Sequence, residues 1–144
     1  MGSPILPDAG SAFGERVRAR LRDEQVIWFT TVGADGTPQP NPVWFLWEDP
    51  ASIVVYNRPD ANRLRHIRDR PNVALHFNGN DRGGDIVIFT GHAQPAHDLP
   101  APHAHAGYLG KYRAAMSRVS GDPEVFSAAY PVALRVLVRR VRGF

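Results

Sequence analysis

A basic segment of the sequence, residues 54–77, carries the residues with the clearest chemical potential. Pro59 ends a β-branched run, and Asp60 is placed to cap a short helix by accepting a bond from a free backbone N–H. A helix N-terminus attracts anions, and Arg58 and Arg63 would add charge and paired donors beside it. We therefore predict a phosphate site here, with a solvent-facing basic surface as the simpler alternative.

The same short helix has an apolar side and a basic side. Ala61, Leu64 and Ile67 recur at helical spacing, so we expect them to face the core. The intervening arginines would then face solvent or a ligand: Arg63, Arg65, Arg68 and Arg70. Arg70 lies at the far end of the helix, so we expect it to take no part in binding an anion at the N-terminus.

The histidines offer an alternative, metal-based chemistry. The loop from His92 to His105 holds four of the six histidines, but no carboxylate motif or cysteine accompanies them. A Pro/Ala-rich loop also gives metal ligands no rigid support. We predict no metal site. His66 or His76 could donate a proton to a reduced product, although a structural role is commoner for such histidines.

Short apolar runs separated by turn signals predict the elements that position these residues. Strands are expected at residues 26–32, 42–48, 53–56, 73–78, 85–93 and 132–141. Helices are expected from near Ser11, after Asp60, at 108–119 and from 123 to 130. An Asp-Gly turn at 34–37 joins the first two strands, and Gly91 marks a bulge. Residues 1–10 read as a flexible N-terminal arm and 11–144 as one domain, a small antiparallel barrel with peripheral helices.

Composition limits the function classes. No apolar run reaches the roughly 20 residues of a membrane span, and no signal peptide is evident, so we expect a cytoplasmic protein. The absence of cysteine excludes disulfides and thiolate metal sites. The net charge is +3, and Lys111 is the sole lysine among 17 basic residues. A bias toward arginine suits an anionic aromatic ligand.

Three stretches together resemble a known superfamily: VIWFTTVGADGTPQPNPVWFLWED, SIVVYNRPDANRLRHIRDRPNVALHF, and the closing YLGKYR with ALRVLVRRVRGF. They are similar to the flavin/deazaflavin oxidoreductases with a split β-barrel, which include pyridoxamine-phosphate oxidase. The closer match is the actinobacterial branch of coenzyme F420-dependent reductases. The resemblance runs from about Phe13 to Phe144. It implies a mainly β fold, a six-stranded antiparallel split barrel of FMN-binding type with peripheral helices.

The resemblance also implies a homodimer with the cofactor in a groove between subunits. Arg63 stands where the family has its phosphate-binding lysine. Neighbouring small hydroxyl residues of the family are replaced by Asn57, which can still donate, and by Ala61, which cannot. The basic R-x-V-L-L-K segment of FMN-using oxidases is replaced here by PNPVWF, which favours F420 over FMN.

Carried over to this sequence, the resemblance places nine residues at the cofactor. Along the deazaflavin ring it places Thr30, Thr31, Asn41 and the backbone of Pro42, Val43 and Trp44, with the Trp44 side chain as an apolar wall. At the phosphate it places Asn57, Arg58 and Arg63. Strand alternation puts Thr30 and Thr31 on opposite faces, so part of this set would line the groove. Phe45 is expected in the core.

The predicted function is an F420-dependent oxidoreductase that transfers a hydride between reduced deazaflavin and a small conjugated organic substrate. The cofactor does the hydride chemistry, so no catalytic side chain is assigned. One alternative is an FMN-dependent enzyme resembling pyridoxamine-phosphate oxidase. Another is a non-catalytic protein that binds a flavin, F420 or a tetrapyrrole. A single-stranded nucleic-acid module is disfavoured, because the aromatics lie in continuous apolar strands rather than among basic residues.

Overall fold

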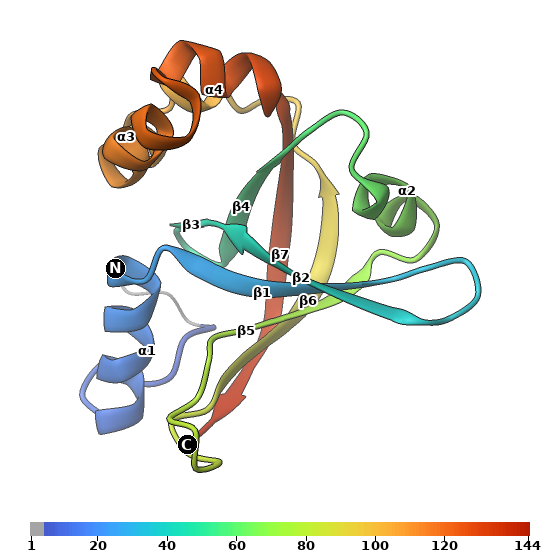
Figure 1. Cartoon of the computed structure of the whole chain (residues 1–144). Coiled ribbons are helices and arrows are strands. Elements are labelled where there is room, and N and C mark those ends of the chain that lie inside the picture. The colour runs from blue at the N-terminus through green and yellow to red at the C-terminus, as the bar shows by residue number, and fades with distance from the viewer. Residues whose placement is uncertain (1–4) are drawn as a thin grey trace.

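The structure is a computed structural model, and it describes residues 5–144. One antiparallel sheet of seven strands curls on itself, with helices around it (Figure 1). The strands are β1 Val26–Val32, β2 Pro38–Trp44, β3 Leu46–Glu48, β4 Ser52–Asn57, β5 Asn72–His76, β6 Val87–Pro95 and β7 Val132–Gly143. The helices are α1 Ala12–Asp23, α2 Asn62–Asp69, the 3₁₀ turn η1 Pro102–Ala104, α3 Ala106–Ser120 and α4 Pro123–Ala129. The predicted mainly β fold of split-barrel type is confirmed, with seven strands instead of six.

The curl of the sheet follows from its strand order, β2-β1-β5-β6-β7-β4-β3. The two edge strands, β2 and β3, are consecutive in the chain and separated only by Phe45. One continuous segment of the chain therefore forms both edge strands. The sheet must curl so that its two edges lie next to each other. The single strand predicted at 42–48 was wrong in its start and in its continuity. The observed strand β2 begins at Pro38, and Phe45 separates it from β3.

The interruption at Phe45 is held by a side chain from α3. The Phe45 N–H donates to the Tyr112 hydroxyl at 2.8 Å, and that hydroxyl lies 2.7 Å from the Phe45 carbonyl oxygen. One tyrosine thus satisfies both main-chain groups that would otherwise pair within a sheet. The Phe45 side chain is fully buried in the core, as predicted.

Two apolar clusters support the fold. The larger fills the inside of the curled sheet, and the smaller lies between β4 and the α3–α4 pair. β7 alternates as predicted, with Leu134, Val136 and Val138 buried and Arg135 on the other face. The bulge predicted at Gly91 is confirmed by a register shift there. A Cβ at Gly91 would lie 2.2 Å from the Leu137 carbonyl oxygen, so only glycine allows this close approach.

The helix starts differ in their capping. α1 begins after Ser11, whose Oγ accepts from the Gly14 N–H at 2.9 Å, as predicted. The capping role predicted for Asp60 was wrong: α2 begins one residue later, with Ala61 at the N-cap and no side-chain bond. The first-turn N–H groups of α2 therefore have no side-chain acceptor.

The predicted N-terminal arm is partly packed. Leu6 is buried against the larger cluster, and the Pro7 carbonyl accepts from Arg18 Nη1 at 2.6 Å. Residues 1–4 lie outside the described part of the chain. None of the described helices is long and apolar enough to cross a membrane.

Candidate functional site

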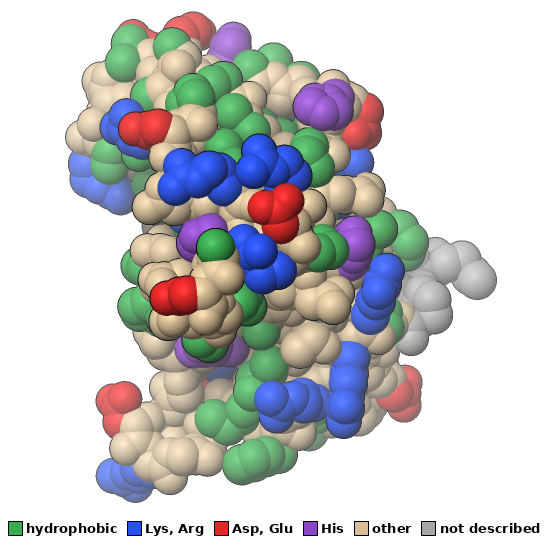
Figure 2. All heavy atoms as spheres, turned by 90° about the vertical axis from the view of Figure 1, so that its right-hand side faces the viewer, with side chains coloured by type: hydrophobic (Ala, Val, Ile, Leu, Met, Phe, Trp, Pro, Cys, Tyr) green, Lys and Arg blue, Asp and Glu red, His purple; other side chains and the backbone are tan. Residues whose placement is uncertain are grey.

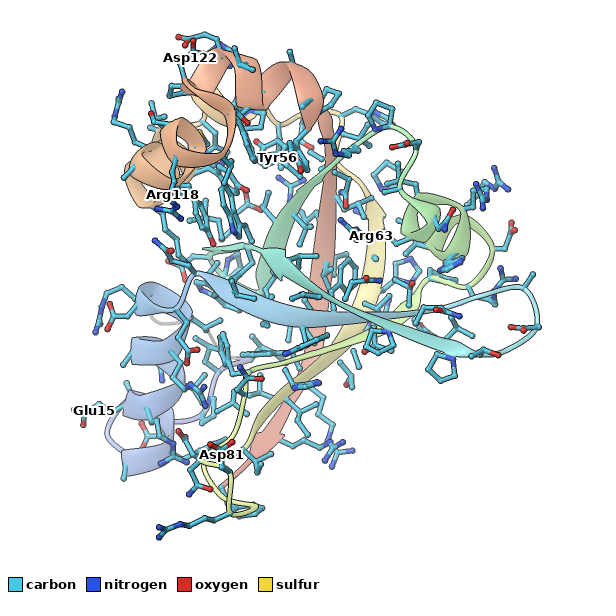
Figure 3. All side chains as sticks on the ribbon, viewed as in Figure 1. Glu15, Tyr56, Arg63, Asp81, Arg118 and Asp122 are labelled. Atoms are coloured by element: carbon cyan, nitrogen blue, oxygen red, sulfur yellow. The ribbon has the colours of Figure 1, made fainter. Side chains whose placement is uncertain are left out.

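Two neighbouring hollows share one arginine. The polar hollow, of about 410 Å³, is lined mainly by Thr31, Gln39, Asn41, Asn62, Arg63 and His66. The aromatic hollow, of about 320 Å³, is lined mainly by Val43, Trp44, Tyr56, Arg63, Tyr108, Phe126 and Tyr130. Arg63 forms part of both walls. Figure 3 shows Arg63 on the side of α2 toward the sheet, with Tyr56 below α4.

A buried asparagine fixes the Arg63 guanidinium. Arg63 Nε donates to Asn57 Oδ1. Asn57 is fully buried, and its Nδ2 donates to the carbonyls of Val55 at 3.1 Å and Val132 at 3.0 Å. Both polar atoms of the Asn57 side chain thus have partners inside the protein, one of which is Arg63.

The remaining donors of Arg63 are available. Within residues 5–144 neither Nη atom has a hydrogen-bond or ion-pair partner. Burial lowers the pKa of Arg63 from its usual value, but an arginine in a protein keeps its charge. The result is a half-buried cation with a fixed Nε and two outward nitrogens, the geometry that suits an oxyanion.

Arg58 lies at the outer end of an aromatic stack. Ring centroids in the series Tyr112, Trp44, Phe126 and Tyr130 are 4.9, 5.1 and 4.5 Å apart, with planes within 15°. The Arg58 guanidinium lies 4.9 Å from the Tyr130 centroid and is exposed. Trp44 stacks on both Tyr112 and Phe126 and also lines the aromatic hollow.

The structure brings together only part of the predicted site. Thr31 and Asn41 line the polar hollow, while Pro42, Val43 and Trp44 line the aromatic one. Thr30 faces the other way and lines a separate hollow on the far side of the sheet.

Arg70 is not the inert residue expected from its position. Its Nε donates to the Val32 carbonyl at 2.9 Å, so it ties the end of α2 to β1.

His66 is a site residue that the sequence analysis did not assign to the cofactor. Its Nδ1 lies 2.8 Å from Thr31 Oγ1, and it lines the polar hollow. Its position three residues after Arg63 places both on one helix face, a signal that could have identified it. Gln39 follows similarly from alternation with Asn41 along β2. Tyr108 and Phe126 gave no such signal, because they come from helices far along the chain.

The histidine loop has structural contacts. His103 Nδ1 lies 2.7 Å from Ser127 Oγ, which joins η1 to α4. His105 Nδ1 accepts from the Tyr108 N–H at 3.2 Å and caps α3. In residues 5–144 no group of three or more histidine, aspartate or glutamate side chains could hold a metal ion.

Comparisons with known proteins place this geometry in context. The family model for pyridoxamine 5'-phosphate oxidase matches residues 13–138. A search of curated proteins found no match. One similar solved structure is an F420 reductase, 23% identical, with a TM-score of 0.64, covering 87% of this chain and 94% of its own.

Two further structures share the fold. A FAD-binding protein from Mesorhizobium loti is 20% identical, with a TM-score of 0.61 and 88% of each chain covered. A conserved hypothetical protein from Mycobacterium tuberculosis is 18% identical, with a TM-score of 0.67, covering 99% of this chain and 88% of its own. Likeness at these identities concerns the fold. The family match, which spans most of the chain, goes further: this chain belongs to the pyridoxamine 5'-phosphate oxidase family.

Proposed function

We propose that this protein is an F420-dependent oxidoreductase that transfers a hydride between reduced deazaflavin and a small conjugated organic substrate. Members of its family are generally oxidoreductases that bind flavins. The observation that carries the F420 assignment is Arg63, whose unpartnered Nη atoms lie where the polar and aromatic hollows meet. The cofactor would bind along the polar hollow with its phosphate at Arg63, and the aromatic hollow beside it would leave room for the organic substrate.

The charge around α2 suits an anion longer than a phosphate. Among the described residues, Arg58, Arg63 and Arg65 form no ion pair with an acidic side chain. Figure 2 shows basic side chains gathered across the middle of the face that carries α2. F420 continues from its phosphate into an acidic oligoglutamate tail, which such a surface would attract. FMN has no such tail.

The chain's own residues would bind and orient the reactants. Arg63 would hold the phosphate, aided by the uncapped first turn of α2. Thr31, kept in place by His66, and Asn41 would offer hydrogen bonds to the polar edge of the ring. The aromatic hollow would exclude water from the reacting face. When bound, F420 supplies the hydride.

The proposal includes a homodimer. The β2 residues from Pro38 to Pro42 are exposed in the single chain, and both hollows border this strand. A second subunit packed against β2 would cover the hollows and their ligand. Sedimentation at micromolar concentration should show a dimer. A monomer that binds the cofactor at full strength would contradict this part of the proposal.

The central experiment is a fluorescence titration of the wild-type protein with F420 and with FMN. We expect tighter binding of F420. Arg63→Ala should cost about 1.5–3 kcal/mol, or roughly ten- to over a hundredfold in F420 affinity, because a charge-assisted contact is lost. Equal or tighter binding of FMN would favour the second candidate, an FMN-dependent enzyme.

Arg68→Ala is the matched control. Arg68 lies on the same helix and is 70% exposed, and among the described residues it pairs only with the adjacent Asp69. Arg70 does not serve, because it bonds to Val32. If Arg68→Ala and Arg63→Ala weaken binding equally, diffuse charge explains the affinity and the phosphate site is wrong. Oxidation of reduced F420 with a panel of acceptors then separates an enzyme from a non-catalytic carrier.

A further inference from the structure

Two tyrosines one turn apart on α3 differ completely in their hydrogen bonding. The Tyr112 hydroxyl accepts from the Phe45 N–H and lies 2.7 Å from the carbonyl oxygens of Phe45 and Gln25. The Tyr108 hydroxyl has no hydrogen-bond partner anywhere in residues 5–144, although its side chain is only 1% exposed. The hydroxyl oxygen is not completely buried, so it can reach a molecule in the aromatic hollow that Tyr108 lines.

The Tyr108 ring cannot turn to find a partner inside the protein. Tyr56 packs edge-on against it at 4.8 Å, and Tyr112 lies against it at 4.7 Å. Tyr108 lines the aromatic hollow, whose walls combine aromatic rings with polar groups such as the Arg63 guanidinium. The Tyr56 hydroxyl in the same hollow already donates to the Pro100 carbonyl at 2.6 Å. Tyr108 therefore keeps a fixed O–H donor at a place built to receive a flat ring.

We infer that the aromatic hollow binds a flat conjugated molecule whose carbonyl oxygen accepts a hydrogen bond from the Tyr108 hydroxyl. Burial raises the pKa of Tyr108 far above its usual value, so the phenol keeps its proton and acts as a donor. Arg63 in the same wall adds further donors for oxygen. A volume of about 320 Å³ lies at the small end of ligand pockets and suits a molecule of one or two rings.

In the proposed reductase this molecule would be the hydride acceptor, and that role alone depends on the proposed function. Donation to the carbonyl oxygen would draw electron density from the conjugated system and favour its reduction. Tyr108 would then be a specificity-determining residue, because a ligand without an acceptor oxygen leaves the buried hydroxyl unpaired. Binding itself needs no cofactor and can be measured without one.

The test compares methyl naphthyl ketone with ethylnaphthalene, which has nearly the same shape and no acceptor oxygen. Equilibrium dialysis of the full chain without cofactor gives the affinity for each. We expect the wild type to prefer the ketone. Tyr108→Phe removes only the hydroxyl and should lower ketone affinity by about three- to tenfold while leaving ethylnaphthalene unchanged.

Tyr56→Phe is the matched control, because its hydroxyl lines the same hollow but is already bonded to Pro100. It should leave the preference for the ketone unchanged. The inference is overturned if the wild type binds neither probe, or if Tyr108→Phe keeps the full preference for the ketone. The latter result would mean that the hydroxyl holds only water.

The same variants separate this inference from the proposed function. Tyr108→Phe should bind F420 as the wild type does, because the phosphate contact lies at Arg63. It should also unfold at nearly the same temperature as the wild type, since the hydroxyl bonds to no residue within 5–144. If the wild type binds the ketone but not F420, the proposed function fails while the inference about Tyr108 stands. A Tyr108→Phe protein that is less stable than wild type would contradict the absence of a partner.

Discussion

The arginines of α1 and α2 look alike in sequence and differ sharply in the folded chain. On α1, Arg18 and Arg20 donate hydrogen bonds to other parts of the protein. Arg18 bonds to the carbonyls of Pro7 and Gly14, and Arg20 bonds to the carbonyls of Asn78 and Asp85 and to Glu24. On α2, Arg63 donates to the protein only from Nε, and within residues 5–144 its two Nη atoms have no partner.

The difference shows that the count of basic residues on a helix does not identify an anion site. What identifies it is a guanidinium that is fixed by the protein and still has donors left beside a hollow. α1 meets the first condition and not the second, because all three guanidinium nitrogens of Arg20 bond to the protein, and Arg18 lines neither the polar nor the aromatic hollow. α2 meets both at Arg63. Substitutions on the two helices should therefore affect different properties.

The largest expected effect on stability is that of Arg20→Ala. The Arg20 side chain is 13% exposed, and its guanidinium lies 4.8 Å from the Phe77 ring centroid as well as bonding two carbonyls. Its loss should lower the free energy of unfolding by about 2–3 kcal/mol, measured by urea denaturation. F420 affinity of the folded protein should stay within about twofold of wild type. A change of that size is smaller than the loss of one hydrogen bond would cause. A large loss of affinity would remove the distinction between the helices.

Asn57→Ala should affect both properties, because Asn57 connects Arg63 to the core. Removing the amide takes one hydrogen bond from each of the carbonyls of Val55 and Val132, and we expect a loss of about 1–2 kcal/mol in the free energy of unfolding. F420 affinity should fall by about tenfold, because Arg63 then loses its fixed orientation. If stability falls and affinity does not, Arg63 needs no support to bind.

Arg63→Lys sharpens the comparison further, since it keeps the charge and removes the fork of donors. A lysine cannot both bond to Asn57 and present two nitrogens to an oxyanion. We expect F420 affinity to fall by about three- to tenfold, less than for Arg63→Ala. Fluorescence titration measures this, and full affinity in the lysine variant would show that charge alone suffices.

The smallest expected effect is that of salt. Raising the salt concentration from about 50 to 300 mM should weaken F420 binding by about two- to fourfold, because Arg58 and Arg65 are exposed and attract the acidic tail through water. The midpoint of urea unfolding should change little, since the contacts of Arg20 are mostly to main-chain carbonyls. No effect of salt on binding would argue against a role for the surface arginines.

Much of the fold could be predicted because local signals agree with it. β1 was predicted at its observed bounds, since a β-branched and aromatic run ends at an Asp-Gly turn. α1 was predicted to begin near Ser11, since apolar residues recur at helical spacing after it, and it does begin there. β2 was predicted too short, because prolines at 38, 40 and 42 read as a loop in sequence. An edge strand tolerates proline, and that β2 is an edge depends on the order of the whole sheet.

The site could be predicted only where its residues are close in sequence. Arg63 and its helix were recognisable, and Thr31 and Asn41 followed from the resemblance. The role of Asn57 as a support for Arg63 could not be recognised from the sequence, because its Nδ2 bonds to Val132, which is 75 residues away. Tyr108 could not be recognised either, because it is distant in sequence from the other site residues and its hydroxyl has no partner within residues 5–144.

The place of β7 in the sheet has a consequence for how the chain assembles. β7 is the last strand of the described chain and lies between β6 and β4, pairing with both. While the protein is being synthesised, one edge of β6 and one edge of β4 therefore stay unpaired until residues 132–143 leave the ribosome. Such edges invite pairing with other chains, so the nascent protein is exposed to aggregation until β7 has paired with both strands. A chain that stops before Val132 should leave those edges open for good.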